Sequence, residues 1–215
     1  MKFALILIYI FIIFLLSIIY KKFYPNNKEA IRKIIHIGIG PLIPIAKLLE
    51  IDQNAALYFS GLISSLIFLN YQFKLFPSIE DVDRKSFGTL FYCLSVFILI
   101  YLFWNKDPNA LIVGFFIMTF GDGFAGLIGK NFKSKSWFIL GQKKSFYGTL
   151  TMFFTSLLVL ISLGLFQQYT FNLNINYFAI AVIATLLEQF SIFGIDNFIV
   201  PISAAIYFNF FITGL

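Results

Sequence analysis

Asp122 lies between Gly121 and Gly123 at the end of a long apolar run, and a basic segment follows it. A carboxylate in such a membrane-grade segment is costly unless it has a partner or a function. A basic segment that contains glycines offers the charges and backbone N–H groups that a phosphate needs. The lysines of this segment are Lys130, Lys133, Lys135, Lys143 and Lys144. We therefore interpret residues 121–148 as a polar site at the surface of a membrane protein.

Spacing by four residues would place Asp122, Gly126 and Lys130 on one face of a helix. A neighbouring row of small residues would let a second helix approach closely, and it consists of Gly121, Ala125 and Gly129. One interpretation is a packing seam in which Lys130 neutralises Asp122. We favour the other, in which Asp122 holds Mg²⁺ on a nucleotide phosphate and the glycines let the ligand come near. Gly121 and Gly126 are then candidate nucleotide-binding residues.

A second polar pattern precedes the next apolar run. Lys143, Lys144 and Ser145 stand where that helix is predicted to begin, and Gly148 follows. Free backbone N–H groups at a helix start favour an anion. Orientation of the protein in the membrane would explain the lysines but not the serine and glycine, so we predict phosphate binding by these four residues. The similar residues 85–91 indicate either a second phosphate contact or only a helix start.

His36 is the only histidine, and it lies about one helical turn after Arg32 and Lys33. A single histidine is often structural. Because two cations lie close by, we give equal weight to a role of His36 in ligand contact or proton transfer. A metal site is not expected here, because the sequence has neither a second histidine nor a thiol cluster. We take Arg32 and Lys33 as candidate phosphate ligands and His36 as a candidate catalytic residue.

Glu188 lies inside another apolar run, and Asp196-Asn197 follows it after a short turn. An acidic residue in a membrane span is expensive and usually functional. We therefore predict a catalytic or metal-binding role for Glu188. Asp196 has two open interpretations, a catalytic carboxylate and a simple cap of the last helix, and Asn197 is a candidate ligand contact.

The composition predicts an all-α membrane protein. Of the 215 residues, 60% are hydrophobic and only 12% are charged, whereas soluble domains are about 45–50% apolar and about 25% charged. We expect one integral membrane domain over residues 1–215, a polytopic bundle of transmembrane helices. The net charge of +6 favours membrane orientation and anionic ligands in this setting, and no nucleic acid partner is expected. Nothing in the sequence indicates an oligomeric state.

About 20 apolar residues are needed for one helical crossing of a bilayer. Eight segments approach that length and predict about seven to eight spans: 3–20, 35–49, 54–70, 88–104, 109–129, 146–166, 175–192 and 197–213. The second is short and contains Gly38, Gly40, Pro41 and Pro44. We expect it to be broken or re-entrant, which requires that protein or water satisfy its backbone.

Most of the 16 basic residues lie in three alternate loops, at 21–34, 71–87 and 130–145. The positive-inside rule places these loops in the cytoplasm and both termini outside. The candidate residues then lie near the cytoplasmic ends of the predicted spans, where separate segments can form one site. Few polar residues fall near the middle of the spans, which makes a transporter a weaker interpretation.

The polar motifs resemble those of the CTP-dependent lipid kinases, a family that includes dolichol kinase, phytol kinase and CTP-dependent diacylglycerol kinase. Three patterns in family order carry the resemblance across residues 32 to 201: Arg32-Lys33-x-x-His36-x-x-x-Gly40, then Gly121-Asp122 through Ala125 and Gly129 to Lys143-Lys144-Ser145-x-x-Gly148-Thr149, then Glu188 through Asp196-Asn197 to Pro201. This chain has Tyr147 where many members have Glu, so no carboxylate role carries over there.

The resemblance implies transfer of the γ-phosphate of CTP to a membrane lipid alcohol, with a divalent metal. We expect Mg²⁺ on Asp122 and Glu188, phosphate contacts from the cations, and an isoprenoid alcohol of the phytol, polyprenol or dolichol type. Asp122, His36 or Asp196 would orient or deprotonate the hydroxyl. Diacylglycerol is the second candidate substrate. A cytidylyltransferase that forms a CDP-lipid is a further alternative, although the C-terminal signature of those enzymes is missing. Transport is the non-enzymatic alternative.

Overall fold

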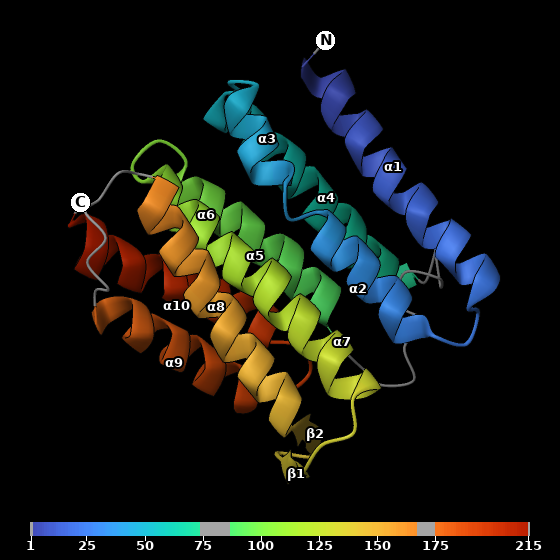
Figure 1. Cartoon of the computed structure of the whole chain (residues 1–215). Helices are drawn as coiled ribbons and strands as arrows, with labels where there is room; N and C mark the ends of the chain where they lie inside the picture. Colours follow the sequence, from blue (N-terminus) through green and yellow to red (C-terminus); the bar gives the residue numbers. More distant parts are fainter. Residues whose placement is uncertain (1, 74–86, 167–174, 215) are drawn as a thin grey trace.

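The computed structural model describes residues 2–73, 87–166 and 175–214, apart from the side chain of Lys28. Its elements are helices with one small hairpin (Figure 1). They are α1 (Lys2–Phe23), α2 (Lys28–Gly38), α3 (Leu42–Leu48), α4 (Gln53–Phe73), α5 (Gly88–Phe103), α6 (Pro108–Phe116), η2 (Ile117–Asp122), α7 (Gly123–Asn131), β1 (Ser136–Ile139), β2 (Gln142–Ser145), α8 (Phe146–Phe166), α9 (Ile175–Gln189), α10 (Asp196–Phe208) and η3 (Asn209–Thr213). Residues 85 and 86 of the second Lys-Ser pattern, and most of the basic loop 71–87, lie outside the described residues.

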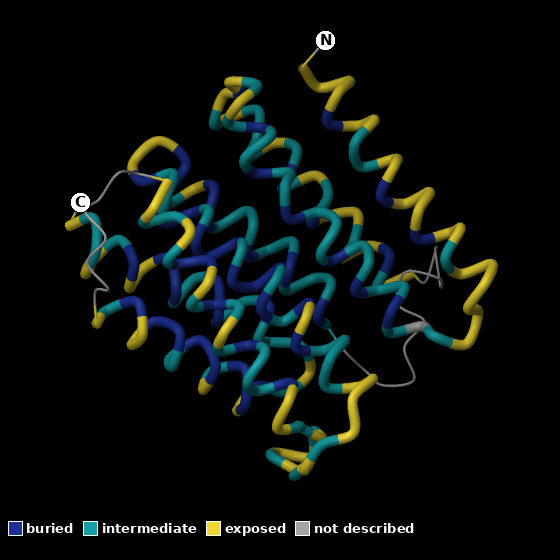
Figure 2. The backbone as a smooth tube through the Cα atoms, viewed as in Figure 1, coloured by how far each residue is buried: buried dark blue, intermediate teal, exposed yellow. Residues whose placement is uncertain are grey.

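Five helical segments are long and apolar enough to cross a membrane. They are α1, α4, the continuous helix from α6 through η2 to α7, α8, and α10 with η3, while α5 and α9 are shorter apolar helices. Large apolar side chains stay exposed along α1 and on the outer faces of the bundle (Figure 2), as expected where lipid covers them. The structure agrees with an all-α membrane fold, and the number of seven to eight spans stays a prediction.

The second predicted span is broken, as its glycines and prolines indicate. α2 ends at Gly38 and α3 starts at Leu42, and the backbone turns between them at Gly40 and Pro41. A Cβ on Gly40 would lie 2.7 Å from Cζ of Phe120, so only glycine fits this close approach. The freed carbonyl of Gly38 accepts a hydrogen bond from the Tyr9 hydroxyl at 2.5 Å.

The basic loop at 130–145 contains a hairpin that the sequence analysis did not predict. β1 and β2 pair antiparallel, with Trp137 opposite Lys144 and Phe138 opposite Lys143. The turn residues Leu140 and Gly141 both have positive φ, 48° and 76°, as a two-residue turn between twisted strands requires. Lys143 and Lys144 therefore lie in a strand, and the helix that they were predicted to start begins at Phe146.

Polar contacts at the end of the bundle away from the hairpin tie distant segments together. Asp107 caps α6 and also accepts hydrogen bonds from Asn209 at 2.9 Å and Thr213 at 2.7 Å. Lys47 donates to the carbonyl of Trp104 at 3.0 Å. The buried core between α5, α6, α8, α9 and α10 lies between this end and the hairpin end. The other polar cluster, at the hairpin end, is the candidate site.

Candidate active site

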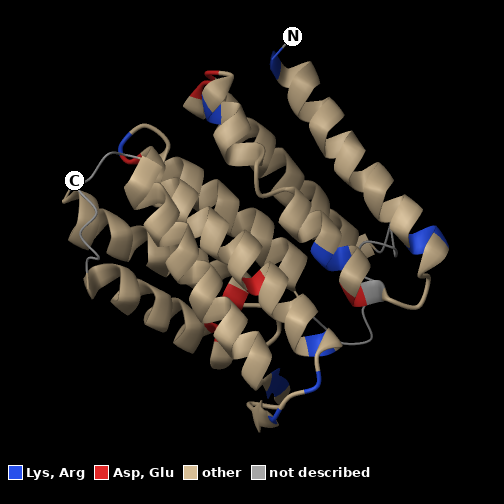
Figure 3. Ribbon diagram, viewed as in Figure 1, with Lys and Arg blue, Asp and Glu red and all other residues tan. Residues whose placement is uncertain are grey.

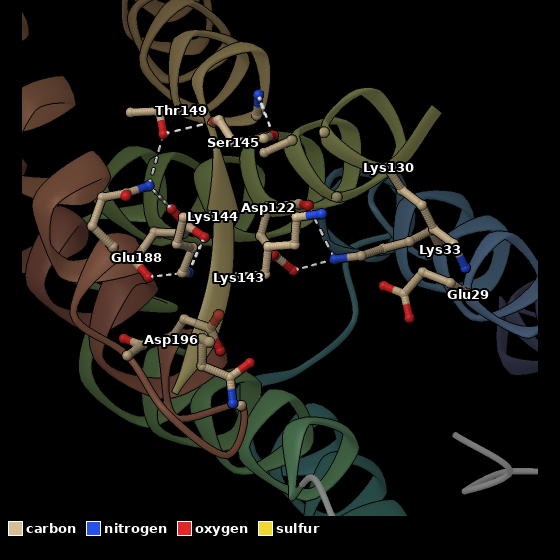
Figure 4. Close-up of a pocket in the computed structure, with 18 of the residues that line it drawn as sticks. Glu29, Lys33, Asp122, Lys130, Lys143, Lys144, Ser145, Thr149, Glu188 and Asp196 are labelled. Carbon is tan, nitrogen blue, oxygen red and sulfur yellow. Dashed lines mark hydrogen bonds and ion pairs between the residues drawn. The ribbon is translucent and has the colours of Figure 1, made fainter. Parts of the chain in front are cut away.

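A cavity of about 780 Å³ opens at the hairpin end of the bundle, where α2, α7, β2, α8, α9 and α10 meet (Figure 4). It gathers candidate residues from three separate parts of the sequence, as the motifs predicted. Those that line it are Arg32, Lys33, Asp122, Gly126, Lys130, Lys143, Lys144, Ser145, Gly148, Glu188, Asp196 and Asn197. His36 and Gly121 are not part of the lining.

Asp122 ends the π-helical segment η2, in the middle of the longest continuous helix. Its carboxylate Oδ2 lies 2.6 Å from Nζ of Lys33, which also donates to the Asp122 carbonyl at 3.0 Å. Lys33 is only 1% exposed, and it reaches Asp122 because Gly126 leaves room: a Cβ there would lie 2.6 Å from Cε of Lys33. Lys33 is therefore the ion-pair partner of Asp122, and the less favoured alternative, in which Lys130 neutralises Asp122, is wrong.

His36 lies behind Asp122 rather than in the cavity. Its Nε2 is 3.1 Å from the carbonyl of Met118 and 3.5 Å from Oδ2 of Asp122, and its ring contacts Tyr92 edge-on at 4.6 Å. A carbonyl oxygen only accepts, so Nε2 must carry the proton in this contact. This nitrogen is therefore a donor to the π-helical segment and has no lone pair for a substrate proton.

Gly121 and Gly129 mainly allow the continuous helix of η2 and α7 to pack closely against α8. A Cβ on Gly121 would lie 2.9 Å from Sδ of Met152, and one on Gly129 would lie 3.3 Å from Cα of Gly148. Gly121 is thus buried against α8 and away from the cavity, in contrast to its predicted role in nucleotide binding. Ser145 Oγ accepts a hydrogen bond from the Gly148 N–H at 3.2 Å, so this hydroxyl caps α8.

Glu188 forms the second ion pair of the cavity, at the end of α9. Its Oε1 accepts a short hydrogen bond from Lys144, and Lys144 also donates to the Glu188 carbonyl at 2.6 Å. Gln189 donates to Oε2 of Glu188 at 2.8 Å and to the Thr149 hydroxyl at 2.9 Å. Trp137 of β1 donates to Gln189 at 3.2 Å. These contacts fix the hairpin to α9.

Gln189 and Thr149 line the cavity, and the sequence analysis did not select them as site residues. The only signal was their position, since Gln189 follows Glu188 directly and Thr149 closes the second polar pattern. Glu29 was also missed. It lies 2.7 Å from the Arg32 guanidinium. Burial lowers the pKa of Arg32, but the charge of Glu29 and its hydrogen bond raise it, and the net pKa of Arg32 is raised.

Asp196 is the first residue of α10, and Ile195 occupies the N-cap position. Asp196 is therefore not the N-cap of the last helix. Among the described residues, its Oδ1 accepts a hydrogen bond only from the N–H of Asn197, at 3.1 Å. No described cation pairs with it within 4 Å, whereas Asp122 and Glu188 each have a lysine. Asp196 is half-buried and lines the cavity.

Two buried polar atoms of the cavity residues lack a hydrogen-bond partner among the described residues. They are Nε of Arg32 and Oδ1 of Asn197. The Asn197 side chain is 3% exposed and held by a hydrogen bond from Nδ2 to the Gly88 carbonyl at 3.0 Å. Buried polar groups are nearly always satisfied in folded proteins, so these two atoms indicate that a ligand or water completes the site.

The carboxylates fit a Mg²⁺ ion that arrives with a nucleotide. Mg²⁺ keeps several waters and usually binds one or two carboxylates together with substrate phosphates. Within the described ranges, no group of three or more His, Cys, Asp or Glu residues forms a ready metal site. Asp122, Glu188 and Asp196 nevertheless line one cavity, and Asp196 is close enough to interact with the charges of the other two. Mg²⁺ on Asp122 and Glu188 stays a prediction.

Comparison with known proteins gives relatives of one kind. A phytol kinase from Synechocystis is 36% identical over 183 residues, which cover 83% of this chain and 77% of that protein. A probable chloroplastic phytol kinase 2 from Glycine max is 28% identical over 62% of this chain, and a probable chloroplastic phytol kinase 1 from Oryza sativa is 26% identical over 80%. The chain spans 45% and 61% of the lengths of these two plant proteins.

No family model and no solved structure matches the chain. The match to the Synechocystis relative covers most of both proteins. The motifs of this chain also meet in one cavity. Its sequence similarity to the relatives is therefore more than a shared membrane composition. The chain therefore belongs to the phytol kinase family, within the polyprenol and phytol kinases.

Proposed function

We propose that this protein is a CTP-dependent lipid kinase that transfers the γ-phosphate of CTP to the hydroxyl of a membrane isoprenoid alcohol of the phytol, polyprenol or dolichol type. The observation that carries the proposal is the cavity itself. Five cationic side chains and four carboxylates line it at one end of a bundle of membrane-length helices. The names of the relatives point to phytol kinases, and CTP as donor comes from the family resemblance.

A triphosphate suits the charge of this cavity. Its lining cations are Arg32, Lys33, Lys130, Lys143 and Lys144. Lys130 and Lys143 are exposed, and neither has an ion pair among the described residues. Phosphoryl transfer needs positioning and charge stabilisation more than covalent help from the protein. A cluster of cations at fixed positions supplies both.

We assign the proton of the lipid hydroxyl to Asp196. Of the four lining carboxylates, it is the one with no described cation within 4 Å, which leaves its oxygens available to accept a proton. The hydroxyl oxygen would attack the γ-phosphorus, the bond from that phosphorus to the bridging oxygen of the β-phosphate would break, and the diphosphate would leave with the charge that the cations stabilise. Bound Mg²⁺ would neutralise phosphate charge during this transfer.

We also propose that the cavity faces the cytoplasm. Lys and Arg residues gather at the hairpin end of the bundle (Figure 3), and the positive-inside rule places such an end in the cytoplasm. CTP would then reach the cavity from water, while the alcohol would enter sideways from the bilayer between the apolar helices.

The test uses the full chain in lipid nanodiscs with Mg²⁺, a panel of lipid alcohols, and CTP labelled on the γ-phosphate. We expect label in a lipid phosphate from CTP and not from ATP, and loss of this transfer in Asp196→Asn. The matched control is Asp52→Asn, which changes an exposed carboxylate at the other end of the bundle. Formation of a CDP-lipid with release of pyrophosphate would favour a cytidylyltransferase, and no turnover across the panel would refute the kinase.

A further inference from the structure

The hairpin also exposes side chains that do not line the cavity. Trp137 and Lys144 are opposite each other and point to α9, where they bond Gln189 and Glu188. Side chains alternate along a strand, so Phe138 lies on the other, outer face with its partner Lys143. Lys143 extends to the cavity, whereas Phe138 does not line it and is 72% exposed. Leu140 at the turn is 65% exposed and has a positive φ of 48°, a conformation that leucine rarely adopts.

Basic residues surround this outer face without acidic partners in the sequence. Lys133 and Lys135 precede β1, are exposed, and do not line the cavity, so the proposed nucleotide does not account for them. The sequence contains no Asp or Glu between Asp122 and Glu188. Phe132, next to Lys133, is 61% exposed. The segment thus combines uncompensated positive charge with exposed aromatic and aliphatic side chains.

The ends of two membrane-length helices hold this segment at the bilayer surface. The continuous helix from α6 ends at Asn131, and α8 begins at Phe146. Only residues 132–145 connect them, and they are bonded back to α8 through the Phe146 N–H to the Lys135 carbonyl at 2.9 Å and the Tyr147 N–H to Ser134 Oγ at 3.3 Å. A segment so short and so tied stays within reach of the lipid headgroups.

We infer that the outer face of the hairpin docks on the anionic phospholipids of the bilayer surface, with Phe138 and Leu140 among the headgroups and Lys133 and Lys135 on their phosphates. Anionic lipid attracts basic residues close to the membrane, and apolar side chains beside such residues anchor in the headgroup region. The inner face of the same hairpin carries Lys144. Lipid contact outside would therefore hold this cavity lysine in position.

The test measures where the hairpin tip lies and uses no turnover, so it is independent of the proposed function. Cys93 is the only cysteine, and Cys93→Ala with Leu140→Cys therefore allows one fluorescent nitrobenzoxadiazole label at the tip. The full chain is placed in nanodiscs of phosphatidylcholine, with or without about 30% phosphatidylglycerol. Reduction of the label by dithionite reports its exposure to water. Cys93→Ala with Lys106→Cys carries the control label at the opposite end.

We expect dithionite to reduce the tip label at least roughly tenfold more slowly than the control label in anionic discs. The control label also corrects for repulsion of dithionite by the anionic surface. Lys133→Gln with Lys135→Gln should raise the rate at the tip toward its value in neutral discs. Lys21→Gln with Lys22→Gln removes the same charge from exposed lysines at the end of α1 and should not.

Three results would overturn the inference. The tip and control labels could react equally fast in anionic discs, which would place the tip in water. The rate at the tip could be the same with and without phosphatidylglycerol, which would remove the anionic partner. The two double variants could change the rate equally, which would show that only total charge matters. The substituted lysines are exposed, so loss of the fold would not explain any of these results.

Discussion

Replacement of Lys33 and Asp122, singly and together, separates the structural role of their ion pair from its chemical role. The pair joins α2 to the end of η2 with 2.6 Å between Nζ and Oδ2. The side chains are 2% and 16% exposed, so neither charge is well solvated when the other is removed. We expect Lys33→Met and Asp122→Asn each to destabilise the protein and the double variant to recover part of the loss.

The structure gives the magnitude. Removal of one partner from a buried ion pair costs about 3–5 kcal/mol, and we take about 3 kcal/mol for each single variant because Asp122 opens to the cavity and Lys33 keeps the Asp122 carbonyl as acceptor. Independent losses would sum to about 6 kcal/mol. The double variant leaves no buried charge unpaired, so we expect a loss of about 3 kcal/mol and a coupling of about 3 kcal/mol.

The free energy of unfolding is measured in mixed micelles by titration with a denaturing detergent. The control is the exposed pair of Lys2 and Glu50, whose atoms are 3.4 Å apart and whose side chains are 51% and 86% exposed. Lys2→Gln should cost between about 0 and 1 kcal/mol. Phosphoryl transfer is measured on the same samples.

The two measurements are expected to diverge. The double variant regains stability, but its turnover should stay at least roughly 1,000-fold below that of the parent protein, because the carboxylate that would hold charge at the reacting phosphate is gone. Turnover near the parent level in the double variant would show that Asp122 serves only the fold. A double variant that loses the full sum of the single losses would refute the coupling.

Three further predictions concern other parts of the site. His36→Gln should keep most of the turnover and His36→Ala should lose at least roughly tenfold in kcat, because a glutamine amide can still donate to the Met118 carbonyl; equal losses would contradict this role. Gly126→Ala should destabilise by about 1–3 kcal/mol by displacing Lys33, and Gly61→Ala, which meets a side chain at 3.3 Å, should cost less in the same unfolding titration. Removal of Mg²⁺ with a chelator should stop transfer and its return should restore it, as label in lipid phosphate would show.

Much of the fold could be predicted because membrane helices leave a strong signal. The length of the apolar runs predicted the helices, and Gly40 with Pro41 predicted the break in the second segment. The hairpin left no comparable signal. Its strands have four residues each and contain Lys143 and Lys144, and its turn uses Leu140 where an asparagine or aspartate is typical.

The sequence indicated which residues form the site, but not which of them contact one another. Helical periodicity relates only residues of the same helix. For this reason the one lysine that it offered as a partner for Asp122 was Lys130. The actual partner, Lys33, is 89 residues away in the chain, and no local pattern relates the two. The same limit explains Gly126, which was predicted to make room for a ligand: it lines the cavity, and it also makes room for Lys33, which the sequence did not indicate.

The pairing in the cavity has a consequence for how a nucleotide would bind. Lys33 and Lys144 neutralise Asp122 and Glu188, so phosphates that recruit these lysines must leave two carboxylates without their partners. An unpaired charge in a site with little water is costly. A divalent cation that arrived with the phosphates would remove that cost, because Asp122 and Glu188 could then hold it and regain a partner for their charges. We therefore predict that the ion pairs of the site make the binding of nucleotide and of Mg²⁺ mutually dependent.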